Sequence, residues 1–190
     1  MADPARAALA EHRALTEGIE ELLPRVDEIA QAVIATYDSG GRLFTFGNGG
    51  SAADAQHVAA ELVGRYLRER RPLAATALSV DPSVVTCIAN DYSFDDVFAR
   101  QVLALARPGD LVAGFTTSGR SENVVRGLAA AREAGASTVV FTGGAEDAPV
   151  AAHADLVLAV PSTTTARIQE MHLLLVHLVV EQVDAWAAAS

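Results

Sequence analysis

The chain has 190 residues, of which 51% are hydrophobic, so it is long and apolar enough for one domain with a sizeable core. Its net charge of −10 and pI of about 4.8 disfavour binding to nucleic acid or to an anionic membrane, which would repel it. It has fourteen arginines, no lysine and one cysteine, Cys87, which excludes Schiff-base chemistry and internal disulfides and fits a cytoplasmic protein.

The N-terminal part, Pro4 to Tyr37, has apolar residues at helical spacing and is divided or kinked at Pro24. It has no signal-peptide core, and it precedes the first expected strand. We therefore expect this arm to find little core in its own chain and to pack against a partner subunit. The run Asp38-Ser39-Gly40-Gly41 ends it.

From residue 42 onward, short apolar segments alternate with helical ones. The expected strands are Arg42–Phe46, Leu73–Ser79, Leu111–Thr116, Thr138–Thr142 and Asp155–Val160. The expected helices are Ser51–Leu67, Pro82–Ala89, Phe94–Ala106, Glu122–Ala134, Ala148–Ala152 and Thr164–Ala188. Apolar strands separated by helices predict a parallel sheet covered on both faces, with ligands bound beyond the carboxyl ends of the strands.

The stretch Phe44 to Glu61 joins a strand to a helix through the glycine-rich turn Gly47–Ser51. The first N–H groups of such a helix are unpaired, and the helix dipole adds about half a positive charge, so the turn favours phosphate binding. A dinucleotide fingerprint is disfavoured because its acidic residue, for which Asp81 is the candidate, comes too late. A P-loop is excluded because it needs a lysine.

A second loop of this kind follows the strand expected at residues 111–116. Four hydroxyl groups and a glycine, on Thr116, Thr117, Ser118, Gly119 and Ser121, precede the next helix. N-capping by Ser121 would need only one hydroxyl. The larger number favours an anion held by the hydroxyls and the helix N-terminus together.

Two helices carry candidate metal ligands. His57 and Glu61 are spaced i, i+4 and share a helix face. On the last helix, Gln169 and His177 are eight residues apart, about 80° around the axis. Each histidine alone is more often a core or surface residue, but the two nitrogen and two oxygen donors together suit zinc, although glutamine is an uncommon ligand. A buried His177 would also need a partner.

Four motifs in order make the chain similar to a known family. They are GNGGSAADAQH at residues 47–57 with Glu61, IANDYSFDDVFARQ at 88–101, TTSGRSENV from 116 and TARIQEMH at 165–172. Together they resemble the sugar-isomerase (SIS) domain family, and within it the phosphoheptose isomerases, over nearly the whole chain. The resemblance implies a flavodoxin-like, three-layer α/β/α sandwich with a five-stranded parallel sheet. Residues 1–190 would form one domain, with 1–37 an oligomerisation arm and 38–190 the core.

The resemblance also implies a function and its residues. The activity would be aldose–ketose isomerisation of a seven-carbon sugar phosphate, in a homotetramer with active sites between subunits. The Gly47 loop and the Gln169 helix would then come from neighbouring chains. One zinc ion per subunit would be bound by His57, Glu61, Gln169 and His177. Substrate contacts would fall on Asn48, Gly49, Gly50, Ser51, Glu61, Asn90, Asp91, Thr116, Thr117, Ser118, Ser121 and Gln169.

Such an isomerisation moves a proton between C1 and C2 through an enediolate, so it needs a base for the carbon proton and a partner for the hydroxyl proton. The resemblance assigns these catalytic roles to Glu61 and His177. A carboxylate bound to zinc is a weakened base. Either the metal shifts when substrate arrives, or it takes over polarisation of the carbonyl.

Two alternatives belong to the same fold. One is a non-catalytic SIS module that binds a sugar phosphate or a replication-initiator protein, and such relatives lack the counterparts of Glu61 and His177. The other is an isomerase of hexulose or amino-sugar phosphates, and the amino-sugar type relies on a lysine that this chain does not have.

Overall fold

The computed structural model describes residues 3–144 and 148–189, so the ends of the expected 1–190 domain and residues 145–147 lie outside the described part. Its centre is a parallel sheet of five strands in the order β2-β1-β3-β4-β5, as expected for a flavodoxin-like fold. The strands are β1 (Leu43–Gly47), β2 (Ala75–Ala77), β3 (Leu111–Phe115), β4 (Ser137–Gly143) and β5 (Leu156–Val160). The sheet confirms the predicted fold class.

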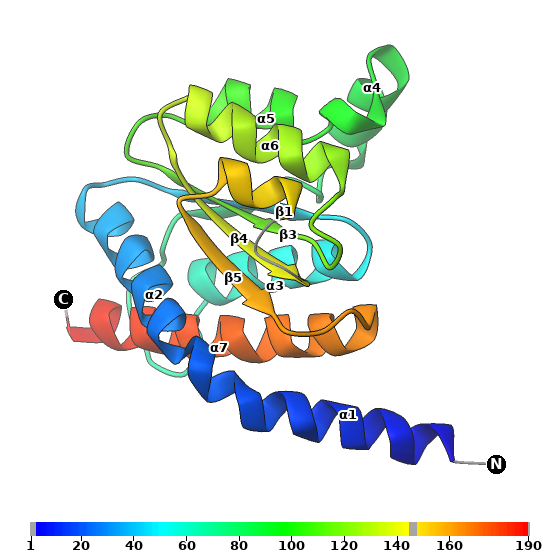
Figure 1. The fold of residues 1–190 in the computed structure, drawn as a ribbon. Helices are drawn as coiled ribbons and strands as arrows, with labels where there is room; N and C mark the ends of the chain where they lie inside the picture. Colours follow the sequence, from blue (N-terminus) through cyan, green and yellow to red (C-terminus); the bar gives the residue numbers. More distant parts are fainter. Residues whose placement is uncertain (1–2, 145–147, 190) are drawn as a thin grey trace.

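Helices cover both faces of the sheet (Figure 1). One layer holds α4 (Pro82–Asp91), η2 (Phe94–Asp96), α5 (Ala99–Leu105), α6 (Glu122–Glu133) and η3 (Pro149–His153). The other holds α2 (Leu23–Asp38), α3 (Gly50–Val63) and α7 (Thr165–Ala189). Successive residues of β1 point to opposite faces, so Leu43 joins one apolar core and Phe44 the other. Each of the two layers therefore packs on its own core.

The N-terminal arm is divided as expected, but its second helix packs on the core of its own chain. It is divided by η1 (Ile19–Leu22), and Pro24 lies in the first turn of α2, where its fixed φ is favourable. The prediction that the arm has little core of its own is wrong for α2, which buries Val26, Ile29 and Val33 next to α7. Those side chains complete the apolar face that α7 presents to the sheet.

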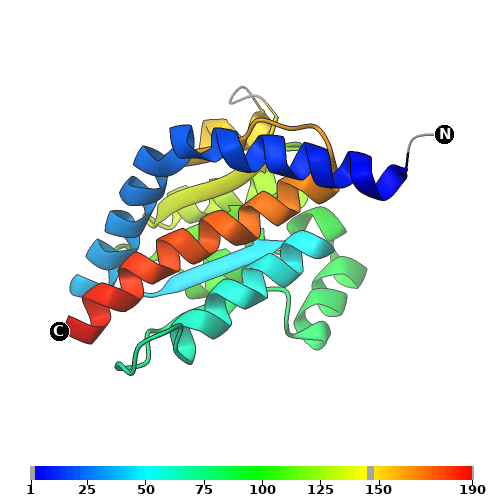
Figure 2. The ribbon, with the colours of Figure 1, turned by 90° about the horizontal axis from the view of Figure 1, so that it is seen from below.

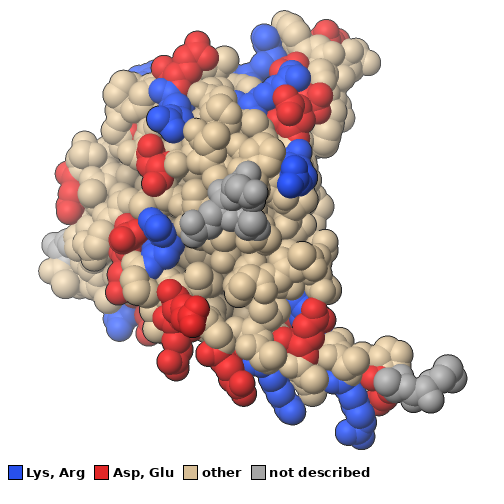
Figure 3. Space-filling model, viewed as in Figure 1, with Lys and Arg blue, Asp and Glu red and all other residues tan. Residues whose placement is uncertain are grey.

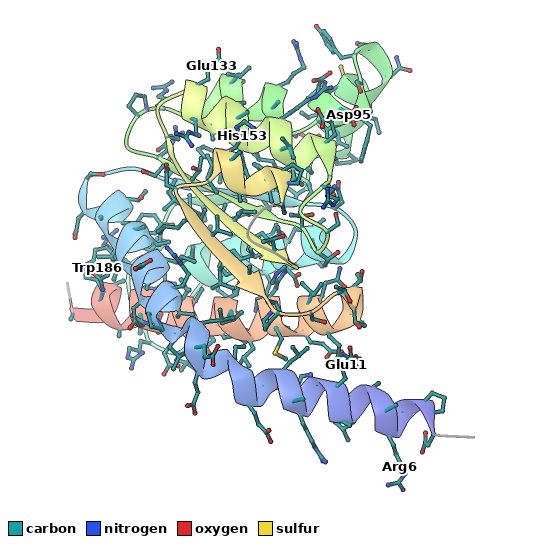
Figure 4. All side chains as sticks on the ribbon, in the orientation of Figure 1. Arg6, Glu11, Asp95, Glu133, His153 and Trp186 are labelled. Carbon is teal, nitrogen blue, oxygen red and sulfur yellow. The ribbon has the colours of Figure 1, made fainter. Side chains whose placement is uncertain are left out.

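Helix α1 (Pro4–Gly18) extends from the body, and none of its residues is fully buried (Figures 1 and 2). Glu11 points towards the body, where it accepts a hydrogen bond from Thr164 Oγ1 at 2.6 Å, whereas Arg6 points away (Figure 4). The helix is thus attached along one side and open on the other.

Seen from below, α3 and α7 run side by side, and α1 lies on the other side of α7 (Figure 2). Helix α3 ends at Val63, four residues earlier than predicted, because Gly64 leaves the helical conformation. The apolar stretch Leu173 to Val180 lies within α7, and no helix in the described residues is both long and apolar enough to cross a bilayer. On the face in Figure 3, arginines are scattered among acidic side chains.

Candidate active site

The site begins where the strand order reverses. Strands β1 and β3 are neighbours, but the chain leaves β1 for the sheet edge at β2, so the loops after β1 and β3 meet at a topological switch point. Asn48 from the first loop and Asn123 from α6 form a reciprocal amide pair across it, with N···O distances of 2.8 and 2.9 Å. This pair joins the two loops that the sequence predicted to bind phosphate.

The glycine-rich turn favours glycine at two positions, one for its backbone conformation and one for a close approach. Gly49 has a φ of 58°, a left-handed conformation that favours glycine, and it precedes α3. A Cβ added to Gly50 would lie 2.5 Å from Nε2 of Gln169, so α7 packs directly on the first residue of α3. The N–H groups of Ser51 and Ala52 donate to the Asn48 and Gly49 carbonyls, at 3.0 and 3.1 Å. Fewer amides are therefore free for an anion than the sequence predicted.

The hydroxyl loop after β3 is partly occupied by its own turn. Thr116 is buried, and its hydroxyl accepts from the Gly119 N–H at 3.2 Å and lies 3.4 Å from the Ser121 hydroxyl. Ser118 Oγ accepts from the Arg120 N–H at 3.2 Å. These bonds set the direction of the loop and of the N-terminus of α6.

An open pocket at the same edge of the sheet offers polar groups from two segments. Thr117, Ser118 and Arg120 line it from the hydroxyl loop, and Ser162 and Thr163 line it from the connection between β5 and α7. Sequence reasoning missed Arg120, Ser162 and Thr163 as candidates. The signal was available, because all carboxyl ends of parallel strands meet at one edge.

The two helices α3 and α7 bring three titratable side chains together. Nε2 of His57 lies 2.9 Å from Nε2 of His177 and 3.4 Å from Oε1 of Glu61. One ligand atom from each residue fits within a span of 4.8 Å. The side chains of His57 and Glu61 are 37% and 20% exposed, so the cluster is reachable from outside the helical layer. Tyr66 stacks on the His177 ring with centroids 5.6 Å apart, a neighbour that the sequence did not indicate.

Gln169 lies apart from this cluster. It precedes His177 by two turns of α7, a rise of about 12 Å, and its amide is directed at Gly50. Three of the four predicted metal ligands are thus together, and the role of Gln169 as the fourth stays a prediction. The assignment of the Gly47 loop and the Gln169 helix to neighbouring chains is wrong, because one chain packs them against each other.

One further carboxyl group lies near the cluster. Asp54 is on α3, one turn before His57, and its Oδ2 is buried without a hydrogen-bond partner among the described residues. Burial raises the pKa of Asp54 to about 6, and the nearby His57 acts in the opposite direction. The cluster therefore has an additional carboxyl that changes charge close to neutral pH.

Two residues that were predicted to contact the substrate lie away from the loops that follow β1 and β3. Asn90 and Asp91 lie exposed at the end of α4, which stands at the edge of its layer (Figure 1). Within the described part of the chain, their side chains form hydrogen bonds with each other and with Cys87. Their assignment to the substrate stays a prediction.

The fold and these loops define a class of protein. The family profile "SIS domain" matches residues 9–143, and the chain belongs to that family. Within it, the chain belongs with the phosphoheptose isomerases. It is 52% identical over 166 residues to the phosphoheptose isomerase of Roseiflexus sp. (strain RS-1), covering 87% of this chain and 84% of the relative.

Two solved structures support the same placement. The phosphoheptose isomerase of Neisseria gonorrhoeae superposes with a TM-score of 0.90 at 40% identity, covering 96% of this chain and 97% of the other. The phosphoheptose isomerase of Francisella tularensis gives a TM-score of 0.88 at 31% identity, covering 96% and 99%. The similarity spans the N-terminal helices as well as the sheet.

Proposed function

We propose that this chain isomerises D-sedoheptulose 7-phosphate to D-glycero-D-manno-heptose 7-phosphate through an enediolate, as a step of heptose biosynthesis. The observation that carries the proposal is the cluster of Glu61, His57 and His177 at the α3–α7 junction. It combines a carboxylate and an imidazole pair, the two kinds of group that proton transfer between C1 and C2 requires. The lone, exposed Cys87 suits a reducing, cytoplasmic setting.

We propose the following roles, which the contacts support. The Glu61 carboxylate removes the proton from one carbon and returns it to the next. His177 transfers the hydroxyl proton. In the metal-free protein His57 is its hydrogen-bond partner, since one of the two Nε2 atoms at 2.9 Å must carry the shared hydrogen. Tyr66, stacked on the ring, limits its rotation.

We propose that the substrate phosphate binds in the open pocket beside the hydroxyl loop. Thr117, Ser118 and Arg120 provide two hydroxyls and a positive charge, and the N-terminus of α6 adds its dipole. About 12 Å of α7 separates Gln169, whose amide lies against Gly50 at the start of α3, from His177. A seven-carbon sugar phosphate in extended form can span such a distance.

The donor set also fits zinc. Ligand atoms of one tetrahedral zinc ion, bound at about 2.0–2.2 Å, stand about 3.3 Å apart. The separations of 2.9 Å between the two Nε2 atoms and 3.4 Å between His57 Nε2 and Glu61 Oε1 are close to this value. We propose that in the zinc-bound protein the ring hydrogens of His57 and His177 lie on Nδ1, so that both Nε2 atoms and the Glu61 carboxylate bind the ion. Gln169 would join them by turning away from Gly50. Zinc bound there would polarise the substrate carbonyl and stabilise the developing negative charge.

We further propose a homotetramer whose active sites lie between subunits. The cluster is on the outer side of the α3–α7 layer and partly exposed, and α1 has an open side on which Leu9 is 50% exposed. A second copy packed there would cover the apolar residues of α1 and enclose the substrate. Dihedral assemblies commonly bury such surfaces.

The decisive test is product formation from sedoheptulose 7-phosphate by the purified protein. Glu61→Gln and His177→Asn should each lower kcat by about 100-fold or more, because a general acid or base contributes at least that factor. Glu133→Gln, on the exposed end of α6 far from the cluster, is the matched control (Figure 4). The non-catalytic alternative predicts no turnover by the wild type and tight binding of a sugar phosphate. Isothermal titration with Zn²⁺ on the wild type and on His57→Ala tests the metal site separately.

A further inference from the structure

Beneath the cluster lies an ion pair that is wholly buried. Nε of Arg70 is 3.1 Å from Oδ1 of Asp184, and both side chains are 0% exposed. Burying two charges is costly, so such a pair persists only when further hydrogen bonds satisfy both groups. Both Arg70 and Asp184 form such hydrogen bonds. Their partners are backbone groups of the segment that carries Glu61 and Tyr66.

Arg70 uses its remaining donors on the end of α3. Its Nη2 donates to the carbonyl of Glu61 at 2.7 Å, and its Nη1 donates to the carbonyls of Leu62 and Gly64 at 2.8 and 3.3 Å. The last carbonyls of a helix have no partner within the helix, and a cation is favourable at that end. Arg70 therefore caps the turn of α3 that carries Glu61.

Asp184 holds the chain that follows α3. Its Oδ2 accepts from the backbone N–H groups of Leu67 and Arg68, at 3.3 and 2.9 Å. The preceding residue is Tyr66, whose ring stacks on His177. Asp184 is two turns beyond His177 on α7 and so lies on the same side of the helix. One carboxylate thus joins the Tyr66 segment to the helix that carries His177.

We propose that Arg70 and Asp184 are positioning residues, which hold Glu61, Tyr66 and His177 in register across the α3–α7 junction. This rests on the proposed function of the cluster. Neither residue touches the substrate. Both act through the backbone of the segment from Glu61 to Arg68, which has no regular structure beyond Gly64 to hold it in place.

The chain offers a matched control for a purely structural role. Asp110 is also a buried carboxylate, and it accepts from the backbone N–H groups of Arg42 and Arg107 and from the Arg42 guanidinium. It precedes β3, and within the described part of the chain its side chain forms hydrogen bonds with neither α3 nor α7. Asp184→Asn and Asp110→Asn remove equivalent charges, one beneath the cluster and one away from it.

The experiment measures kcat and KM for sedoheptulose 7-phosphate at a temperature where circular dichroism shows both variants folded. Asp184→Asn should lower kcat by about 10-fold or more and change KM by less than about 3-fold, because a misplaced base loses rate more than binding. Asp110→Asn should keep kcat within about 2-fold of the wild type even if its melting temperature falls. Equal kcat values for the two variants would overturn the proposal.

A second readout does not depend on activity. In metal-free protein labelled with ¹⁵N-histidine and kept with a chelator, the Nε2 signals of His57 and His177 report their mutual hydrogen bond, and His177→Asn assigns them. Asp184→Asn should shift both signals and Asp110→Asn neither, whether or not the wild type turns over the sugar phosphate. If Asp184→Asn does not fold, Arg70→Lys should give the same shifts, because lysine keeps the charge but lacks the guanidinium N–H groups that donate to the end of α3. Unshifted signals in Arg70→Lys would contradict the assignment.

Discussion

Replacing His172 with phenylalanine should make the folded protein more resistant to acid. His172 is 0% exposed, and its Nε2 donates to the Thr142 carbonyl at 3.1 Å. Phe115 and Phe141 meet the ring edge-on, with centroids 6.2 and 6.1 Å away, and Nδ1 has no partner among the described residues. Burial lowers the pKa of His172 from 6.5 to about 4, and the bond to Thr142 opposes this shift.

The sign and size of the effect follow from this shift. In the unfolded chain His172 takes up a proton below pH 6.5, whereas in the folded protein it stays neutral until about pH 4. The unfolded state therefore binds more protons in this window, and the free energy of unfolding falls as pH is lowered through it. At about 1.4 kcal/mol per pKa unit, the loss is on the order of 3 kcal/mol. Phenylalanine at this position cannot take up a proton, so the variant does not lose this free energy of unfolding as pH falls.

The assay is urea unfolding of both proteins at several pH values between 7 and 4, at one protein concentration and with a chelator present. The variant loses the hydrogen bond to Thr142, which lowers its stability by a similar amount at every pH. The difference between the two proteins should therefore shrink by about 3 kcal/mol as pH falls from 7 to 4. A difference that stays constant with pH would show that His172 titrates normally and would refute the reasoning.

Three other predictions concern the site and the assembly. Gly50→Ala should lower kcat/KM at least about 10-fold by displacing Gln169, yet change stability by less than about 1 kcal/mol, because alanine is compatible with the first turn of a helix. Thr117→Val should raise KM more than it lowers kcat, since the phosphate is bound equally in the ground and transition states; a crystal structure with the phosphate elsewhere would contradict this. Removing residues 1–18 should dissociate the proposed homotetramer and abolish activity while the core stays folded. Light scattering that showed an active monomer would disprove it.

Much of the fold could be predicted from the chain itself. The strand–helix alternation, the parallel sheet and the two loops after β1 and β3 follow from apolar segments of strand length and from glycine and hydroxyl residues at their ends. These signals are local, because a strand that is buried on both faces is apolar throughout. The i, i+4 spacing of His57 and Glu61 is local in the same sense.

The predictions that were wrong concern contacts between segments that are far apart in the sequence. Residues 23–38 were expected to face a partner, but α2 packs beside α7 in its own chain. Hydrophobic spacing shows that a helix has an apolar face and does not show what covers it. Likewise the Gly47 loop and Gln169 were assigned to different subunits, although Gly50 has no side chain and lets the Gln169 amide lie against it.

The sequence by itself determined the elements, their order and the residue types available for proton transfer and metal binding. Only the tertiary structure decided that His57 and His177, 120 residues apart, share a hydrogen bond while Gln169 turns to Gly50. It also placed the buried Arg70–Asp184 pair under Glu61 and Tyr66. The physical reason is that a helix specifies its own periodicity, but the axial register of two packed helices is set by side chains that meet only in the folded chain.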